Sequence, residues 1–192
     1  MSLSTLWLIL DYGWIASEIY IGVATRTRNG SGTVRDRGTL YLLWLVIVVS
    51  ITAGTWISEA NGPLGFDRPG EGHWLKLTAL LILIAGLALR WSAILSLGKS
   101  FSSNVAIHST QTVLKTGLYR WMRHPSYTGL LLCILAVGLH TLNWISLLVI
   151  TIPTAAVLLY RIHVEEIALR EAFGEEYLEY SRRTKRLVPG VY

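Results

Sequence analysis

One apolar stretch, residues 127–160, constrains the fold of this chain more than any other feature. As a single helix of 34 residues it would be roughly 50 Å long, whereas the hydrocarbon core of a bilayer is about 30 Å thick. The stretch is interrupted by GLHTLNW, residues 138–144, whose Gly, His, Thr and Asn residues are typical of turns and helix caps. The sequence therefore predicts two helices, 126–140 and 143–165, joined by a tight turn.

Three further apolar stretches precede this one, at residues 3–25, 39–58 and 74–97. Each is close to the roughly 20 residues that a membrane-spanning helix needs. Of the whole chain, 52% is apolar and only 15% is charged, and the mean hydropathy is +0.47, which is typical of an integral membrane protein. The predicted fold class is an all-α integral membrane protein, with five transmembrane helices in a single domain over residues 1–192.

The charges between the apolar stretches predict how the chain crosses the membrane. Residues 26–38 carry four arginines against one aspartate, residues 98–126 carry four basic residues and no acid, and residues 59–73 carry three acids and one arginine. Since basic loops remain in the cytoplasm, the N-terminus is expected outside and the C-terminus inside, which requires the hairpin. Segments 98–125 and 161–192 are then expected to lie on one cytoplasmic face and to form a cofactor pocket there.

The formal net charge of +5 comes from basic residues that lie beside the apolar stretches. This placement favours anionic lipid headgroups over nucleic acid as a partner. The single cysteine, Cys133, excludes an intrachain disulfide. The five histidines show no metal-ligand spacing, so no metal is expected.

The segment YRWMRHPSYTG, residues 119–129, stands between two apolar regions. Pro125 is typical of the first turn of a helix, which puts Arg123 and His124 at the positive end of the predicted helix 126–140. Free N–H groups and two cationic side chains at that end could bind a carboxylate or a phosphate. On these residues alone, a basic membrane anchor is an equally good interpretation.

The segment YRIHVEEIALREAF, residues 160–173, follows the last apolar stretch. It places Arg161 and Glu165 four residues apart on one helix face, with Glu166 beside them. A weak ion pair on a solvated helix is one interpretation. A site is the other, because charges so near an apolar span are costly unless they face a cavity or a partner.

Three charged residues lie inside the earlier apolar stretches. Asp11 and Glu18 share one face of the first predicted helix, where they either line a polar cavity or, for Glu18, reach the membrane surface. Arg90 either snorkels to the cytoplasmic surface or binds a ligand. These alternatives stay open on the sequence.

Taken together, QTVLKTGLYRWMRHPSYTG, the apolar hairpin and YRIHVEEIALREAFGEEYLEYSRRTKRLVP resemble the isoprenylcysteine carboxyl methyltransferase family. This family belongs to a wider group with phospholipid N-methyltransferases. The resemblance covers residues 75–190, and its two halves occur in the expected order and separation.

The resemblance implies that S-adenosylmethionine binds at the cytoplasmic face and that a lipophilic acceptor enters from the bilayer. Arg161 matches the arginine that holds the acceptor carboxylate, and Glu165 matches a glutamate that binds the cofactor, so both are implied as catalytic. Val113 and Leu114 are implied near the adenine ring. The full set of implied cofactor contacts is Ala106, Gln111, Thr112, Val113, Leu114, Tyr119, His124, Pro125, Ser126, Tyr127 and Glu165. Gln111 departs from the family, which usually has histidine there.

Several functions remain open beside methyl transfer to a carboxylate. N-methylation of an amine headgroup would require a base to remove the ammonium proton. An NADPH-dependent, sterol-reductase-like enzyme would need further cationic residues for the 2′-phosphate and usually has more helices. A small lipid-binding membrane protein without activity is the non-enzymatic alternative.

Overall fold

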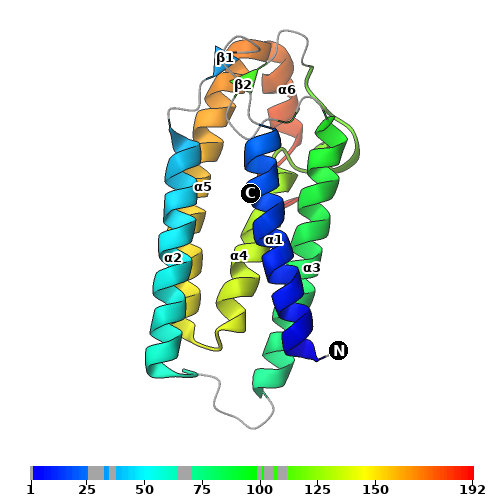
Figure 1. Ribbon diagram of the computed structural model, residues 1–192. Coiled ribbons are helices and arrows are strands. Elements are labelled where there is room, and N and C mark those ends of the chain that lie inside the picture. Colours follow the sequence, from blue (N-terminus) through cyan, green and yellow to red (C-terminus); the bar gives the residue numbers. More distant parts are fainter. Residues whose placement is uncertain are drawn as a thin grey trace.

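The computed structural model describes residues 2–25, 33–34, 38–64, 71–98, 101, 106–107 and 112–192. Its helices are α1 (Leu3–Ala24), α2 (Thr39–Asn61), α3 (Glu71–Leu97), α4 (Pro125–His140), α5 (Trp144–Phe173) and α6 (Glu175–Arg183), with a short 3-10 helix η2 (Gly117–Arg120). The helices α1 to α5 run alongside one another in a bundle, and α6 lies at one end of it (Figure 1).

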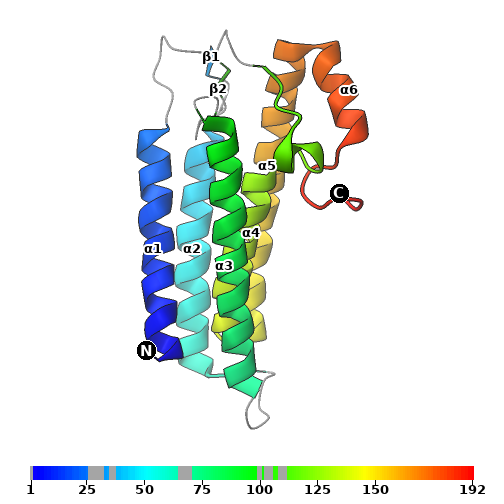
Figure 2. The ribbon, with the colours of Figure 1, turned by 90° about the vertical axis from the view of Figure 1, so that its right-hand side faces the viewer.

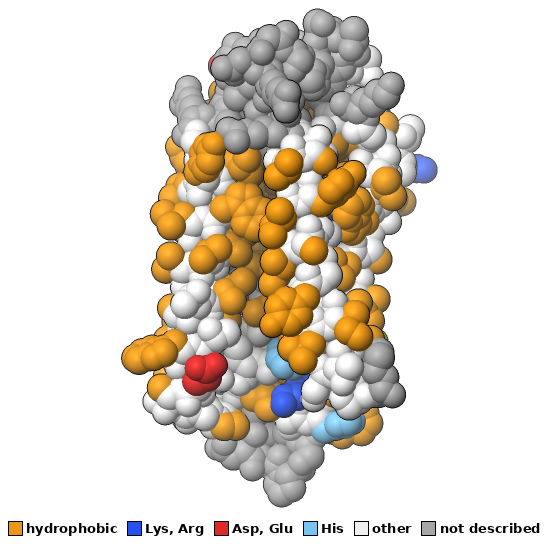
Figure 3. Space-filling view, in the orientation of Figure 1, with side chains coloured by type: hydrophobic (Ala, Val, Ile, Leu, Met, Phe, Trp, Pro, Cys, Tyr) orange, Lys and Arg blue, Asp and Glu red, His pale blue; other side chains and the backbone are white. Residues whose placement is uncertain are grey.

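Four of the described helices, α1, α2, α3 and α5, are long and apolar enough to cross a membrane. Helix α4 is also apolar but has 16 residues, which corresponds to only about 24 Å. Hydrophobic side chains are spread over the middle of the bundle face in Figure 3. Elsewhere in the helices too, large apolar side chains such as Leu45 and Leu81 are exposed. An apolar exterior of this kind suits contact with lipid.

The predicted break in the last apolar stretch is present as a turn between α4 and α5. Asn143 caps α5, because its Oδ1 accepts a hydrogen bond of 3.1 Å from Ser146 N. Its Nδ2 donates to Gly62 O at 2.8 Å, which attaches the turn to the end of α2. Beyond the turn, α5 continues to Phe173, past the end predicted at residue 165.

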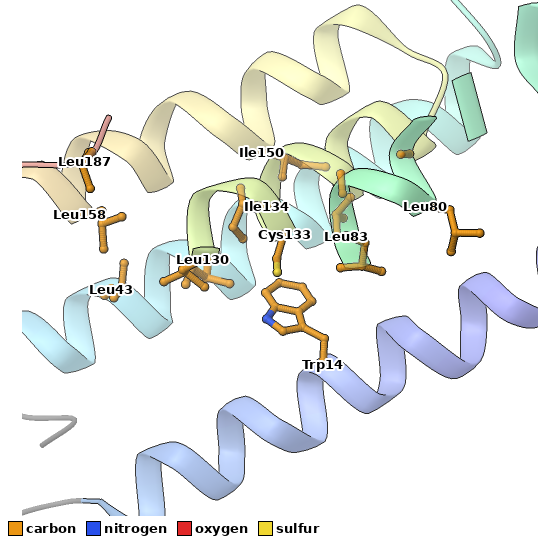
Figure 4. Close-up of a cluster of buried hydrophobic side chains, with 14 of the residues drawn as sticks. Trp14, Leu43, Leu80, Leu83, Leu130, Cys133, Ile134, Ile150, Leu158 and Leu187 are labelled. Carbon is orange, nitrogen blue, oxygen red and sulfur yellow. The ribbon is translucent and has the colours of Figure 1, made fainter. Parts of the chain in front are cut away.

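Helix α4 packs very closely against α3 through glycine. A Cβ at Gly129 would lie 2.7 Å from the backbone oxygen of Gly86 and from the backbone nitrogen of Arg90. Small residues allow this approach, which is typical of helix pairs in membranes. Around it lies the apolar core, in which Leu83 and Cys133 are completely buried (Figure 4).

The two ends of the bundle differ in what they hold. The N-terminus and the α4–α5 turn lie at one end, and α6 and η2 lie toward the other (Figure 2). The strands β1 (Thr33–Val34) and β2 (Ala106–Ile107) pair antiparallel at the α6 end. At that end the segment before α4 meets the C-terminal segment, since Arg123 N donates to Lys185 O at 2.8 Å. The two segments therefore lie at the same end of the bundle, and their location at the cytoplasmic face stays a prediction.

Candidate functional site

Tyr127 on α4 connects the two charged residues that the sequence singled out on α5. Arg161 Nε donates to Tyr127 Oη at 3.0 Å, and Tyr127 Oη donates to Glu165 Oε2 at 2.7 Å. Arg161 is 2% exposed, and its Nη1 also donates to Thr39 Oγ1 at 2.7 Å. The side chain of Glu165 is 27% exposed. A buried guanidinium and a partly accessible carboxylate therefore share one phenol hydroxyl.

His124 lies next to this group, just before α4 begins. Its ring stacks on Tyr127 with centroids 5.6 Å apart, and its Nδ1 is 3.9 Å from Glu165 Oε2. Its Nε2 faces the neighbouring carboxylate, 3.5 Å from Glu166 Oε1, which is too long for a good hydrogen bond. The imidazole is thus held between two glutamates.

Glu166 is a buried residue to which the sequence assigned no role. It is 1% exposed, and Oε1 accepts from Arg123 Nε at 2.8 Å, while Oε2 accepts from Arg186 Nε at 3.1 Å. Adjacent helical residues point about 100° apart, so Glu165 faces Tyr127 while Glu166 faces Arg123 and Arg186, and His124 lies near both carboxylates. The surplus of arginines on both sides of the pair of glutamates was the available signal.

A second buried ion pair joins α1 to α3. Glu18 is 3% exposed and Arg90 is 6% exposed, and Arg90 Nη2 donates to Glu18 Oε2 at 2.6 Å. Trp14 Nε1 donates to Glu18 Oε1 at 3.2 Å. Arg90 Nη1 also donates to Ser126 O and Ser126 Oγ, each at 3.0 Å. Arg90 therefore neither snorkels to the surface nor stands alone, because it ties Glu18 to the first turn of α4.

The Glu18–Arg90 pair and the Tyr127–Arg161 pair border one pocket between the helices. Its polar wall is formed by Glu18, Arg90, Tyr127 and Arg161. Its remaining lining is largely apolar and comprises Ile21, Gly22, Leu40, Leu43, Trp44, Ile47, Phe101 and Leu130. The pocket thus has a charged wall and an apolar wall, a combination that matches the two parts of an amphiphile.

The other residues expected to contact the cofactor belong to the segment before α4 or to the first residue of α4. Gln111 lies outside the described residues, and Ala106 pairs through its backbone with Val34. Thr112, Val113 and Leu114 form an irregular stretch before η2, in which Thr112 is exposed and the other two are half-buried. Pro125 is the buried first residue of α4.

Tyr119 is buried within η2 and fixes this segment to its neighbours. Its hydroxyl donates to Ala93 O at 3.3 Å on α3, and its carbonyl accepts from Tyr180 Oη at 2.6 Å on α6. Burial raises the pKa of Tyr180 to about 12, so its hydroxyl stays protonated and remains a donor near neutral pH. Tyr119 thus links α3, η2 and α6 through one side chain and one carbonyl.

A family model described as the isoprenylcysteine carboxyl methyltransferase (ICMT) family matches residues 78–171. This range begins within α3 and ends within α5. It therefore contains Tyr127, Arg161, Glu165 and Glu166.

Curated relatives match over a larger part of the chain. Protein-S-isoprenylcysteine O-methyltransferase B of Arabidopsis thaliana is 32% identical over 177 residues, which cover 91% of this chain and 87% of that protein. Protein-S-isoprenylcysteine O-methyltransferase of Mus musculus is 34% identical over 139 residues, which cover 71% of this chain and 49% of that protein. The chain spans about half the length of the animal relatives that it matches.

A solved structure shares the fold. The eukaryotic intramembrane Ras methyltransferase ICMT aligns with a TM-score of 0.64 over 98% of this chain and 65% of that chain, at 22% sequence identity. The apolar helices and this likeness are those of an integral, multi-pass membrane protein. The nearly full-length match to the plant relative, with the family model, shows that the chain belongs to the isoprenylcysteine carboxyl methyltransferase family.

Proposed function

We propose that this protein methylates the carboxylate of a lipophilic, isoprenylcysteine-like acceptor and uses S-adenosylmethionine as methyl donor. The observation that carries the proposal is the position of Arg161, a buried guanidinium on the wall of a largely apolar pocket. A guanidinium can bind a carboxylate through two hydrogen bonds. The relatives, which are named protein-S-isoprenylcysteine O-methyltransferases, agree with such an acceptor.

The neighbourhood of Glu165 fits the proposed cofactor. Among the described residues, its polar contacts with Tyr127 and His124 both fall on Oε2. Oε1 is therefore available to accept from an ammonium group or from ribose hydroxyls. Half-buried Val113 and Leu114 offer apolar surface for a flat ring. We propose Thr112, Tyr119 and the segment His124–Tyr127 as further contacts, with Ala106 and Gln111 from the resemblance alone.

The chemistry requires little of the protein beyond binding and alignment. When bound, S-adenosylmethionine supplies an electrophilic methyl group on a sulfonium ion. The acceptor carboxylate is already ionised, so no side chain has to remove a proton. Arg161 would orient the carboxylate, and the pocket would exclude water, which favours a reaction whose opposite charges cancel. Correct alignment of two reactants can contribute several orders of magnitude to the rate.

We propose that all five helices α1 to α5 cross the membrane, with the N-terminus outside and the pocket at the cytoplasmic face. The charge asymmetry of the loops supports this orientation. Helix α4 is short, but it is enclosed between α3 and α5 and need not match the lipid thickness by itself. A cysteine introduced by His140→Cys should react with an impermeant reagent from outside the cell. Labelling from the cytoplasmic side would contradict the proposed topology.

Calorimetry on the detergent-purified protein tests the function directly. We expect binding of S-adenosylmethionine and S-adenosylhomocysteine but not of NADPH, and the reverse would overturn the proposal. Methylation of an S-prenylated cysteine with a free carboxyl group, but not of its amide, would identify the acceptor group. Transfer to an amine headgroup instead would favour N-methylation.

Two variants separate the proposed roles of the site residues. Glu165→Ala should abolish binding of S-adenosylhomocysteine, because the carboxylate proposed to hold it is gone. Arg161→Ala should leave that binding intact and weaken turnover of the acceptor. If both variants bind the cofactor and methylate normally, the assignment of these residues is wrong.

A further inference from the structure

The C-terminal segment after α6 runs along the chain that precedes and opens α4. Arg123 N donates to Lys185 O at 2.8 Å, and His124 N donates to Arg186 O at 2.9 Å. Thr128 Oγ1 donates to Leu187 O at 2.8 Å, and Leu187 itself is only 6% exposed. The tail, residues 184–192, is therefore fastened by its backbone to the segment that carries His124.

Glu166 lies where this tail, the segment before α4 and α5 meet. Arg123, from the segment before α4, donates to Oε1 of Glu166, and Arg186, from the tail, donates to Oε2. Arg170 Nη2, one turn further along α5, lies 3.4 Å from Oε2. Arg123 also reaches beyond the carboxylate, since its Nη1 donates to Ser181 O at 2.9 Å and to Thr184 O. One carboxylate thus holds together guanidinium groups from three parts of the chain.

The balance of charge makes Glu166 essential to this arrangement. Without its negative charge, the buried guanidinium of Arg123 would face those of Arg170 and Arg186 with no counter-charge between them, and like charges repel even where two of them are partly exposed to water. A buried ion pair contributes little net stability compared with apolar packing, but it can fix one geometry among several. The cluster is therefore better suited to fixing the tail in place than to stabilising the fold.

The cluster reaches the proposed cofactor site through His124. The imidazole lies between Glu166 and Glu165, with Nε2 3.5 Å from the first and Nδ1 3.9 Å from the second. It also stacks on Tyr127, whose hydroxyl donates to Glu165. A displacement of the tail or of Arg123 would therefore move the two residues that border Glu165.

We propose that Glu166 is a positioning residue, which clamps the C-terminal tail onto the segment before α4 and thereby sets His124 and Tyr127 against Glu165. This inference rests on the proposed function, because it assigns Glu165 to the cofactor. Glu166 does not touch the acceptor or the cofactor itself. It acts on cofactor affinity through the tail.

The first test compares two ligands of the same enzyme. Glu166→Gln keeps the shape of the side chain and removes the charge, so the dissociation constant for S-adenosylhomocysteine should rise roughly tenfold to a hundredfold. The KM for an S-prenylated cysteine acceptor should change less, because Glu18, Arg90 and Arg161 lie outside the clamped segment and Tyr127 is the one polar residue of that pocket wall that the clamp sets. The matched control is Glu179→Gln, at a glutamate that is 59% exposed and paired with Arg183 on α6. It should leave both constants unchanged.

A second test follows the tail directly and does not depend on any ligand. A cysteine introduced by Leu187→Cys lies at a buried position and should react slowly with a maleimide. Native Cys133 is completely buried and should add no labelling of its own. Adding Glu166→Gln should accelerate labelling at position 187, and adding Glu179→Gln should not. Equal labelling rates in all three backgrounds would overturn the clamp.

A milder variant keeps the inference testable if Glu166→Gln fails to fold. The Arg186 side chain is 31% exposed and is the one cation that the tail gives to Glu166, and its Nη1 also donates to Tyr192 Oη within the tail. Arg186→Gln should therefore weaken S-adenosylhomocysteine binding in the same direction and by less. Unchanged affinity in this variant would refute the clamp. A wild-type protein that binds neither S-adenosylmethionine nor its product would instead refute the proposed function, and the labelling experiment would still decide whether Glu166 holds the tail.

Discussion

Glu18 and Glu166 are both buried carboxylates paired with arginine, but they have different surroundings. Glu18 lies on α1 at the polar wall of the pocket, and its ion pair is with Arg90 alone among the described residues. Glu166 lies near the end of α5, where three arginines, Arg123, Arg170 and Arg186, approach it. One network has a single cation within the bundle, and the other has several at its end.

The number of cations determines what the loss of one does. In the first network, removing the guanidinium leaves a carboxylate without a counter-charge in apolar surroundings, which is among the costliest changes a folded protein can undergo. In the second network, the remaining arginines still neutralise the carboxylate. The first network is therefore expected to be fragile, and the second to respond in steps.

The largest effect is expected for Arg90→Met. It removes the cation beside Glu18 together with the hydrogen bonds to Ser126, and it should lower the free energy of unfolding by about 3–5 kcal/mol. Unfolding of the purified protein in detergent by a denaturant titration measures this loss. The double variant Glu18→Gln with Arg90→Met should recover a large part of this loss, because position 18 then carries no unpaired buried charge. A double variant as unstable as the single one would show that the charge of Glu18 is not the cause.

The next effect is expected for Arg123→Gln, which removes the most buried of the arginines around Glu166. The side chain is 9% exposed and also donates to the carbonyls of Ser181 and Thr184. Since Arg170 and Arg186 remain, the loss should be that of hydrogen bonds involving a charged group, roughly 1.5–3 kcal/mol. The same denaturant titration measures it. A loss as large as that of Arg90→Met would mean that the cations around Glu166 cannot substitute for one another.

The difference between these networks also shows how far the sequence could be interpreted. The lengths of the apolar stretches and the charges between them predicted the helices. The GLHTLNW segment predicted the turn before α5, the helix that Asn143 caps. These features are local, because a helix needs a length and a cap needs one polar residue. The pairing of Glu18 with Arg90 joins residues 72 positions apart and depends on how α1 and α3 are rotated. Neither rotation is encoded in a local pattern.

The same holds within the candidate site. The four-residue spacing put Arg161 and Glu165 on one face of α5, but it gave no sign that Tyr127 of α4 lies between them. Glu166 was visible only as the neighbour of Glu165. Its role depends on the tail returning to α4, which is a contact between distant segments. The end of α5 was predicted too early, at residue 165. The sequence becomes more polar there, but the same helix continues to Phe173 and contacts α6.

A third change perturbs the Glu18 network without altering any charge. In Gly129→Ala, the new Cβ would lie 2.7 Å from the backbone nitrogen of Arg90 and the backbone oxygen of Gly86, and backbone atoms cannot move aside easily. Forcing α3 and α4 apart should lower the free energy of unfolding by about 1–3 kcal/mol. The matched control is Gly13→Ala on α1, where a Cβ meets no atom within 4 Å among the described residues. That variant should be neutral or slightly stabilising, and a similar loss in both would attribute the effect to glycine itself.

The smallest effect is expected for Arg170→Gln. This variant tests whether the other arginines around Glu166 can neutralise its charge without Arg170. The Arg170 side chain is 45% exposed and lies 3.4 Å from Glu166, one turn along the same helix. Water and salt screen the exposed guanidinium although Glu166 itself is buried, so the contribution should be close to that of a solvent-exposed pair at this spacing, about 0.3–0.5 kcal/mol. Since Arg123 and Arg186 continue to neutralise Glu166, the denaturant midpoint should barely move, and the residual loss should shrink further at high salt. A loss comparable to that of Arg123→Gln would show that Glu166 depends on each cation separately, and the contrast with the single pair of Glu18 would then disappear.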